Sequence, residues 1–359
     1  MKIEDFGKIG LVLGGGGFKG AWMAGILKLF LDKRFIPSYA VGGSVGALVG
    51  VKFVELISRI AQGEPNTISL EMIDIWFKLI KKPSDIYELD KEEIFKKTLN
   101  RIFGHKKKYI LKHFPSLLVV EFIKAASLYT NKKIVHLINN LDMEKIRSSP
   151  VEFDIVACDF LSRGPKTYSN RSCDAQILKQ ALLASTALPV IFPTVEIFGS
   201  KNNDGARIMP LPLVYADRTK CDTIVAIHAY PKSRQCPDNQ DGWLADLNTA
   251  DDILSSMLIE SQIRRTEKIN NDLAVFERVK TQILELIPEL LRIEAEKIFE
   301  EANFSFRRKH FNKSYILQPE NSLPVTTAFC SEEGIKKSIA LGYDTDAPRF
   351  LREIINFEI

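Results

Sequence analysis

Residues 8–33 read KIGLVLGGGGFKGAWMAGILKLFLDK, and this stretch decides the fold class. KIGLVL (8–13) is a short apolar run that predicts a buried strand, and GGGGFKG (14–20) predicts a loop. AWMAGILKLFLDK (21–33) has the apolar spacing and composition of a helix. Because strand, glycine loop and helix follow one another directly, the stretch indicates a unit of a parallel α/β sheet.

The same order of elements recurs further along the chain. SYAVGG (38–43) predicts a second strand that ends at Ser44, and ALVGVKFVELISRIA (47–61) predicts the helix after it. Later segments predict strands at 151–160, 222–230 and 314–319, and a closing helix around 332–341. Repeated strand–turn–helix units favour an α/β fold with mainly parallel strands joined by crossover helices.

Two long segments depart from this pattern. Residues 63–149 have a helical and basic character, with no clear strand. Residues 250–303 predict a long amphipathic helical stretch that kinks or breaks at Pro288. We therefore expect a single domain over 1–359, with 63–149 as a helical insertion on one sheet.

Composition excludes several classes of protein. The 359 residues are 45% hydrophobic and 26% charged, and the net charge is +4, with a pI of about 8.6; no nucleic-acid partner is expected from so mild a basic bias. The five cysteines have no spacing motif, so neither a disulfide framework nor a zinc site is indicated. With no secretory signal and no run of ~18–20 apolar residues, we expect a soluble cytoplasmic protein.

Gly42-Gly43-Ser44-Val45-Gly46 fits the pattern GxSxG between a predicted strand and a predicted helix. A serine in such a sharp turn needs small neighbours, because the turn crowds the backbone around it. The turn exposes the hydroxyl at a helix N-terminus, where backbone N–H groups and the helix dipole favour developing negative charge. Gly/Ser turns are common, but the strand–turn–helix context favours Ser44 as a nucleophile.

The glycine loop has two functional interpretations. Gly15, Gly17 and Gly20 match G-x-G-x-x-G, the dinucleotide-binding fingerprint, which also needs an acidic residue at the end of the second strand. That strand ends in Val-Gly-Gly-Ser, so the dinucleotide interpretation fails. Four consecutive glycines also suit an oxyanion hole, since a backbone without Cβ atoms can present several N–H groups to one oxygen. Lys19 is placed either to hold the loop or to face an anionic head group.

A serine nucleophile needs a group that accepts its proton, normally histidine. Of the five histidines, only His228, at the end of a predicted strand, is placed to complete a triad. Asp204-Gly205 would by itself be interpreted as part of a hairpin turn. Asp204 becomes a candidate base because a serine nucleophile needs a proton acceptor and histidine does not supply one convincingly.

Together the three motifs resemble the patatin-like phospholipase family, in that family's order. The family's Gly-Gly-Gly-x-Lys/Arg-Gly loop is matched by residues 15–20, its GxSxG by 42–46, and its Asp-Gly-Gly/Ala by 204–206. ASTALPVIFP (184–193) and the strand at 151–160 also look like the family. The resemblance covers roughly residues 8–230.

The resemblance implies a three-layer α/β/α sandwich with a central, mainly parallel sheet. It implies a lipid acyl hydrolase of the phospholipase A or lysophospholipase type, with Ser44 as nucleophile and Asp204 as general base. Backbone N–H groups of Gly15, Gly16 and Gly17 would form the oxyanion hole, with Lys19, Gly46 and Gly205 in support. No cofactor and no metal are implied. A free Asp, with a pKa of ≈ 3.9, is a poor base for an alcohol, so the oxyanion donors would carry more of the barrier.

The basic part of the insertion, residues 101–135, combines clustered cations with aromatic and aliphatic residues. Such a segment favours a lid or a membrane-facing cap at an anionic lipid surface. The expected partners are a phospholipid or other acyl lipid and, peripherally, an anionic membrane. Acyl transfer, thioester hydrolysis and a catalytically idle lipid-binding module stay open as alternatives, as do a protein activator and export by a route without a leader.

Overall fold

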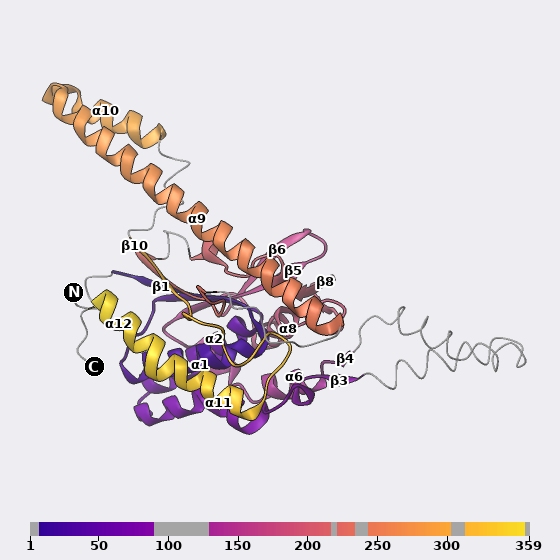
Figure 1. The fold of residues 1–359 in the computed structure, drawn as a ribbon. Helices are drawn as coiled ribbons and strands as arrows, with labels where there is room; N and C mark the ends of the chain where they lie inside the picture. The colour runs from indigo at the N-terminus through magenta and orange to yellow at the C-terminus, as the bar shows by residue number, and fades with distance from the viewer. Residues whose placement is uncertain (1–6, 90–128, 217–220, 234–242, 303–312, 356–359) are drawn as a thin grey trace, which may run out of the picture.

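A computed structural model describes residues 7–89, 129–216, 221–233, 243–302 and 313–355 (Figure 1). At its centre, β1 (Ile9–Leu13) pairs in parallel with β2 (Tyr39–Gly43) on one side and β9 (Thr223–Ile227) on the other. All residues of these three strands are buried. Strands that are covered on both faces are nearly continuous apolar runs. Their sequences therefore do not alternate between apolar and polar residues.

The full sheet has one parallel part and one antiparallel edge. Its order is β10 (Lys313–Leu317), β9, β1, β2, β5 (Glu152–Asp159), β8 (Ser200–Asp204) and β7 (Val195–Ile197), with β6 (Gly164–Ser169) also paired to β5. The strands from β10 to β5 are parallel, whereas β6 and β8 run antiparallel to β5. The strands predicted at 151–160, 222–230 and 314–319 therefore exist, and β6, β7 and β8 were not predicted.

Helices cover both faces of the sheet. Alternate side chains of β1 enter two separate cores, with Leu11 and Leu13 on one face and Val12 on the other. The first core contains α1 (Gly20–Asp32), α2 (Val45–Ala61), α8 (Ala175–Ser185) and α11 (Glu332–Ala340). The second contains the turn η7 (Leu213–Tyr215) and Ile259 of α9 (Trp243–Leu286). The fold is thus an α/β/α sandwich, as Figure 1 shows.

The described part of 63–149 is mainly helical, as predicted. It contains η3 (Asn66–Leu70), α3 (Glu71–Asp74), the π-helical η4 (Ile75–Leu79), η5 (Pro83–Asp85), α6 (Lys132–Asn139) and α7 (Met143–Arg147). The expectation of no strand was wrong, because β3 (Glu88–Leu89) and β4 (Tyr129–Thr130) form an antiparallel pair. Strands of two residues are too short to leave a periodic signal. Most of the basic segment 101–135 lies outside the described residues.

The predicted C-terminal helical stretch consists of two helices. α9 ends at Leu286 and α10 runs over Glu289–Ala302, so the chain breaks its helix at Pro288 as predicted. α11 continues through the π-helical η9 (Leu341–Asp346) into α12 (Ala347–Ile355), which the sequence did not indicate. Among the described helices, none combines the length and the apolar content that crossing a bilayer requires.

Candidate active site

Ser44 sits at the sharp turn between β2 and α2, with φ 56° and ψ −131°. Few residues other than glycine adopt a positive φ, and one forced into it by its neighbours is strained by about 1–3 kcal/mol. The two glycines of the motif make this turn sterically feasible. A Cβ at Gly46 would lie 2.5 Å from the carbonyl oxygens of Leu13 and Gly14, and one at Gly42 would lie 2.6 Å from the carbonyl carbon of Gly46.

The hydroxyl and the backbone amide of Ser44 have separate partners. Ser44 Oγ donates a hydrogen bond to Asp204 Oδ2 at 2.7 Å. Ser44 N donates to Ser185 Oγ at 2.9 Å, and Ser185 Oγ in turn donates to the carbonyl of Val156 at 2.6 Å. The turn is therefore anchored to α8 and β5, which leaves the hydroxyl directed at Asp204.

Asp204 is the last residue of β8, on the far side of β5 from Ser44, and its side chain is fully buried. Its Oδ1 accepts a hydrogen bond from Ala206 N at 2.8 Å, which closes the turn η6 (Gly205–Arg207). Gly205 packs against the carbonyl of Val156 so closely that no side chain fits there. Burial raises the pKa of Asp204 to about 6, although the hydrogen bonds from Ser44 and Ala206 and the charge of Arg207 act to lower it.

The glycine loop contacts the same turn. A Cβ at Gly15 would lie 2.5 Å from Ala206 Cβ, and the Gly15 N–H donates to the carbonyl of Pro210 at 3.0 Å. Within the described residues, the N–H groups of Gly16 and Gly17 donate to no protein acceptor. Gly17 has φ 54° and packs directly on the carbonyl of Thr327. Of the three predicted oxyanion donors, two thus have no acceptor among the described residues, and the third is engaged.

Lys19 follows the loop and is almost completely buried. Its Nζ pairs with Asp252 of α9 at 2.7 Å and lies 4.3 Å from the ring centroid of Tyr230. Burial lowers the pKa of Lys19, and the charge and hydrogen bond of Asp252 oppose that shift. Of the two roles considered from the sequence, this geometry fits holding the loop, since Lys19 ties it to α9.

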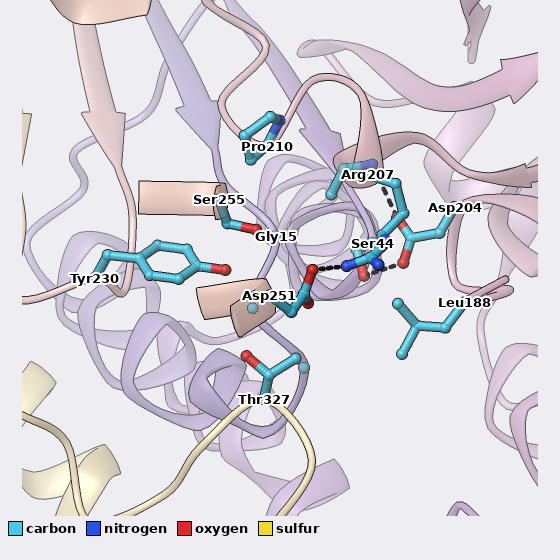
Figure 2. A pocket seen from close by; sticks show the side chains of 13 residues that line it. Gly15, Ser44, Leu188, Asp204, Arg207, Pro210, Tyr230, Asp251, Ser255 and Thr327 are labelled. Carbon is cyan, nitrogen blue, oxygen red and sulfur yellow. Dashed lines mark hydrogen bonds and ion pairs between the residues drawn. The ribbon is translucent and has the colours of Figure 1, made fainter. Parts of the chain in front are cut away.

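These elements enclose a small pocket that contains Ser44 and Asp204 (Figure 2). The space around these residues is about 310 Å³, a figure that includes open solvent at the mouth. The apolar part of the lining comes from Leu188, Pro210 and Ala206. The polar part comes from the glycine loop, Arg207, Tyr230, Asp251, Ser255 and Thr327.

His228 takes no part in this pocket. It is buried just beyond the end of β9, and it is absent from the residues that line the site around Ser44. Burial lowers its pKa to about 4, so its ring is neutral near pH 7. The structure therefore places a carboxylate, and not an imidazole, against the Ser44 hydroxyl.

Several residues of the site were not found from the sequence. Ser185, which accepts the hydrogen bond from the Ser44 amide, lies within ASTALPVIFP (184–193). The similarity of that stretch to the family was the sequence signal that could have pointed to it. Arg207, Asp251 and Thr327 carry no local motif, and Asp251 and Thr327 reach the site only because distant elements fold back onto it. Asp251 comes from α9, whose pattern indicated a helix and nothing more.

Comparison with known proteins matches residues 11–217 to the model of a family described as patatin-like phospholipase. A search of curated proteins finds no match. Among solved structures, the chain is similar to VipD from Legionella pneumophila, with a TM-score of 0.39 and 13% sequence identity. That similarity covers 97% of this chain and 67% of the other.

Proposed function

The chain belongs to the patatin-like phospholipase family, and from that premise we propose that it hydrolyses phospholipid carboxylic esters through Ser44 and Asp204. Membership supports lipid acyl hydrolase activity in general. The observation that carries the finer proposal is the 2.7 Å hydrogen bond from the Ser44 hydroxyl, in a strained strand-to-helix turn, to a fully buried carboxylate. Nucleophile and base within hydrogen-bond reach are the arrangement that covalent catalysis needs.

In the first half of the reaction, Ser44 Oγ attacks the ester carbonyl while Asp204 Oδ2 accepts the hydroxyl proton. The raised pKa of Asp204, about 6, makes it a stronger base than a free aspartate, yet leaves it mostly ionised near pH 7. Asp204 then returns the proton to the leaving alcohol, and the acyl group stays on Ser44. In the second half, Asp204 activates a water molecule that cleaves the acyl-enzyme.

The developing oxyanion needs donors beside Ser44. Gly16 and Gly17, in the loop that lines the same pocket, supply two N–H groups with no acceptor in the part of the chain that the structure describes. The Gly15 N–H joins them only if its bond to the Pro210 carbonyl is exchanged for one to the substrate. Loss of one such donor typically costs about 3–4 kcal/mol in the transition state, so Gly16 and Gly17 carry much of the rate enhancement in this proposal.

The substrate reaches the site from a lipid surface in this proposal. Next to the pocket, the outward face of α9 exposes four apolar side chains, Ile253, Leu254, Met257 and Leu258, while Ser255, Ser256 and Ile259 on the same turns are buried. An amphipathic helix of this kind rests its apolar face in the boundary between head groups and acyl chains. The clustered cations of 101–135 would add attraction to anionic lipids.

The direct test is product analysis with defined phospholipids. The wild-type protein should release free fatty acid and lysophospholipid, and Ser44→Ala should release neither while keeping its fold by circular dichroism. An acylated acceptor in place of free fatty acid would indicate acyl transfer, and turnover limited to acyl thioesters would indicate a thioesterase. Equal fatty acid release by both proteins would contradict the proposed mechanism.

A further inference from the structure

Two neighbouring acids of α9 pair with a cation that follows the glycine loop, Lys19, and with a cation that lines the pocket, Arg207. Asp252 accepts from Lys19 at 2.7 Å and from the Thr327 hydroxyl at 2.6 Å. Asp251 forms an ion pair with Arg207. Figure 2 shows Asp251 and Arg207 pointing toward each other beside Ser44. The helix is therefore attached to the site by one pair whose lysine is buried and by one pair at the pocket surface.

The two cations differ in what they could offer a substrate. Lys19 is 5% exposed and is occupied by Asp252 and the Tyr230 ring. The Arg207 side chain is 40% exposed and lines the same pocket as Ser44. Arg207 ends the turn η6, which the Asp204 side chain closes, so its distance from Asp204 is held by the backbone.

We propose that Arg207 binds the phosphate of a phospholipid substrate, and that Asp251 holds this position as an internal competitor until the substrate displaces it. The inference rests on the proposed function and adds the residue that selects phospholipids over neutral lipids. A guanidinium binds carboxylates and phosphates through the same planar fork of N–H donors. In a glycerophospholipid only a short stretch of glycerol separates the phosphate from the nearest ester, so both ends fit around one turn.

A phosphate can replace the Asp251 carboxylate on Arg207 without detaching α9 from the site. Asp252 keeps α9 attached through Lys19 and Thr327, so the Asp251 side chain can leave Arg207 while its backbone stays in place. A neutral diacylglycerol carries no anion to displace the carboxylate. Preference for phospholipid therefore depends on Arg207, and the affinity for phospholipid is limited by Asp251.

Binding to the Ser44→Ala protein separates recognition from turnover. The ligands are dihexanoyl-phosphatidylcholine and dihexanoylglycerol, used below their aggregation limits and measured by isothermal titration calorimetry. Arg207→Gln should weaken phosphatidylcholine binding about tenfold relative to diacylglycerol binding, because a charge-assisted bond is lost. Asp251→Asn should tighten phosphatidylcholine binding severalfold. The matched controls are Arg264→Gln and Asp272→Asn, on exposed positions further along α9, and they should change neither affinity.

Inorganic phosphate provides a second probe of the same site. It should compete with phosphatidylcholine for the parent Ser44→Ala protein, more strongly for Asp251→Asn, and not at all for Arg207→Gln. Equal weakening of both lipids by Arg207→Gln, or no weakening of either, would overturn the proposal. If the binding results hold but the protein with Ser44 intact cleaves no lipid, the proposed function fails and the assignment of Arg207 stands.

Discussion

At the scale of single residues, the proposed chemistry depends on how far burial raises the pKa of one carboxyl group, that of Asp204. Asp204 has no solvent contact, and the cost of placing its charge in the interior exceeds the help from Ser44, Ala206 and Arg207. Its pKa of about 6 lies above the value of ordinary aspartate. Burial thus makes Asp204 a stronger base than a free aspartate, as the proposed mechanism requires, and composition and spacing cannot reveal this effect.

The pKa of Asp204 predicts how kcat/KM falls on the acidic side of its pH profile. Asp204 works as a base only when ionised, so kcat/KM should be constant above about pH 7 and fall about tenfold for each pH unit below about 6. The measurement is hydrolysis of a soluble short-chain ester from pH 4.5 to 8.5. An activity that stays flat down to pH 4.5 would contradict the assignment of Asp204 as the base.

The main site residues were predictable because each motif is local. Gly42 and Gly46 flank Ser44 in the same turn, and Gly205 follows Asp204 directly, so the steric need and the functional residue appear together in the sequence. Arg207 and Asp251 were not predictable, since their pairing joins two segments with no shared motif. The engagement of the Gly15 N–H by Pro210 likewise depends on tertiary structure.

At the scale of elements, β1 and α2 meet at a contact where only glycine fits. A Cβ at Gly46 would lie 2.5 Å from two carbonyl oxygens, those of Leu13 and Gly14, and backbone atoms cannot move aside as a flexible side chain can. The close approach places the start of α2, and with it Ser44, against the end of the central strand. The GxSxG pattern is therefore a packing requirement as well as a chemical signature.

Gly46→Ala should lower the free energy of unfolding by about 2–3 kcal/mol, because the methyl group forces α2 away from β1. Gly164→Ala is the matched control, since the nearest atom to its Cβ would be the Ser162 carbonyl oxygen at 3.9 Å. Urea unfolding of both variants measures the difference. Equal stability of the two would show that α2 does not depend on this contact.

Strands were predicted correctly where burial on both faces gives a continuous apolar run in the sequence. They were missed where the sequence has no such run. IGLVL is apolar throughout and TIVAI is apolar after its first residue, Thr223, and both are strands at the centre of the sheet. β8 reads SKNND, which carries no β-forming signal, and it becomes a strand only because β5 and β7 flank it. The two-residue strands β3 and β4 are likewise products of pairing.

At the scale of the whole molecule, α9 packs on the second face of the sheet and lies against the pocket that contains Ser44 and Asp204. Asp251 and Ser255 of this helix line the pocket and Asp252 pairs with Lys19, while the opposite face of the same turns exposes a row of apolar side chains. The α/β class was predictable from the alternation of strands and helices. The position of α9 was not, because its own pattern says nothing of the surface on which it packs.

The proposed membrane contact predicts salt-sensitive binding to anionic vesicles. Replacing Lys106, Lys107 and Lys108 with Gln should weaken binding about tenfold or more at low salt, with a smaller difference at high salt. The control is Lys336→Gln with Lys337→Gln, which removes two exposed cations from α11. Co-sedimentation with vesicles measures both variants. Binding that is unchanged by the triple substitution would leave the insertion as a cap without a role in membrane contact.

The central claim is that Ser44 is a nucleophile activated by Asp204, and labelling with a fluorophosphonate serine probe tests it most directly. The account predicts rapid labelling of the wild-type protein, none of Ser44→Ala, and strongly slowed labelling of Asp204→Asn, with all three folded. Labelling of Ser44→Ala at the wild-type rate, or of Asp204→Asn as fast as the wild type, would contradict it.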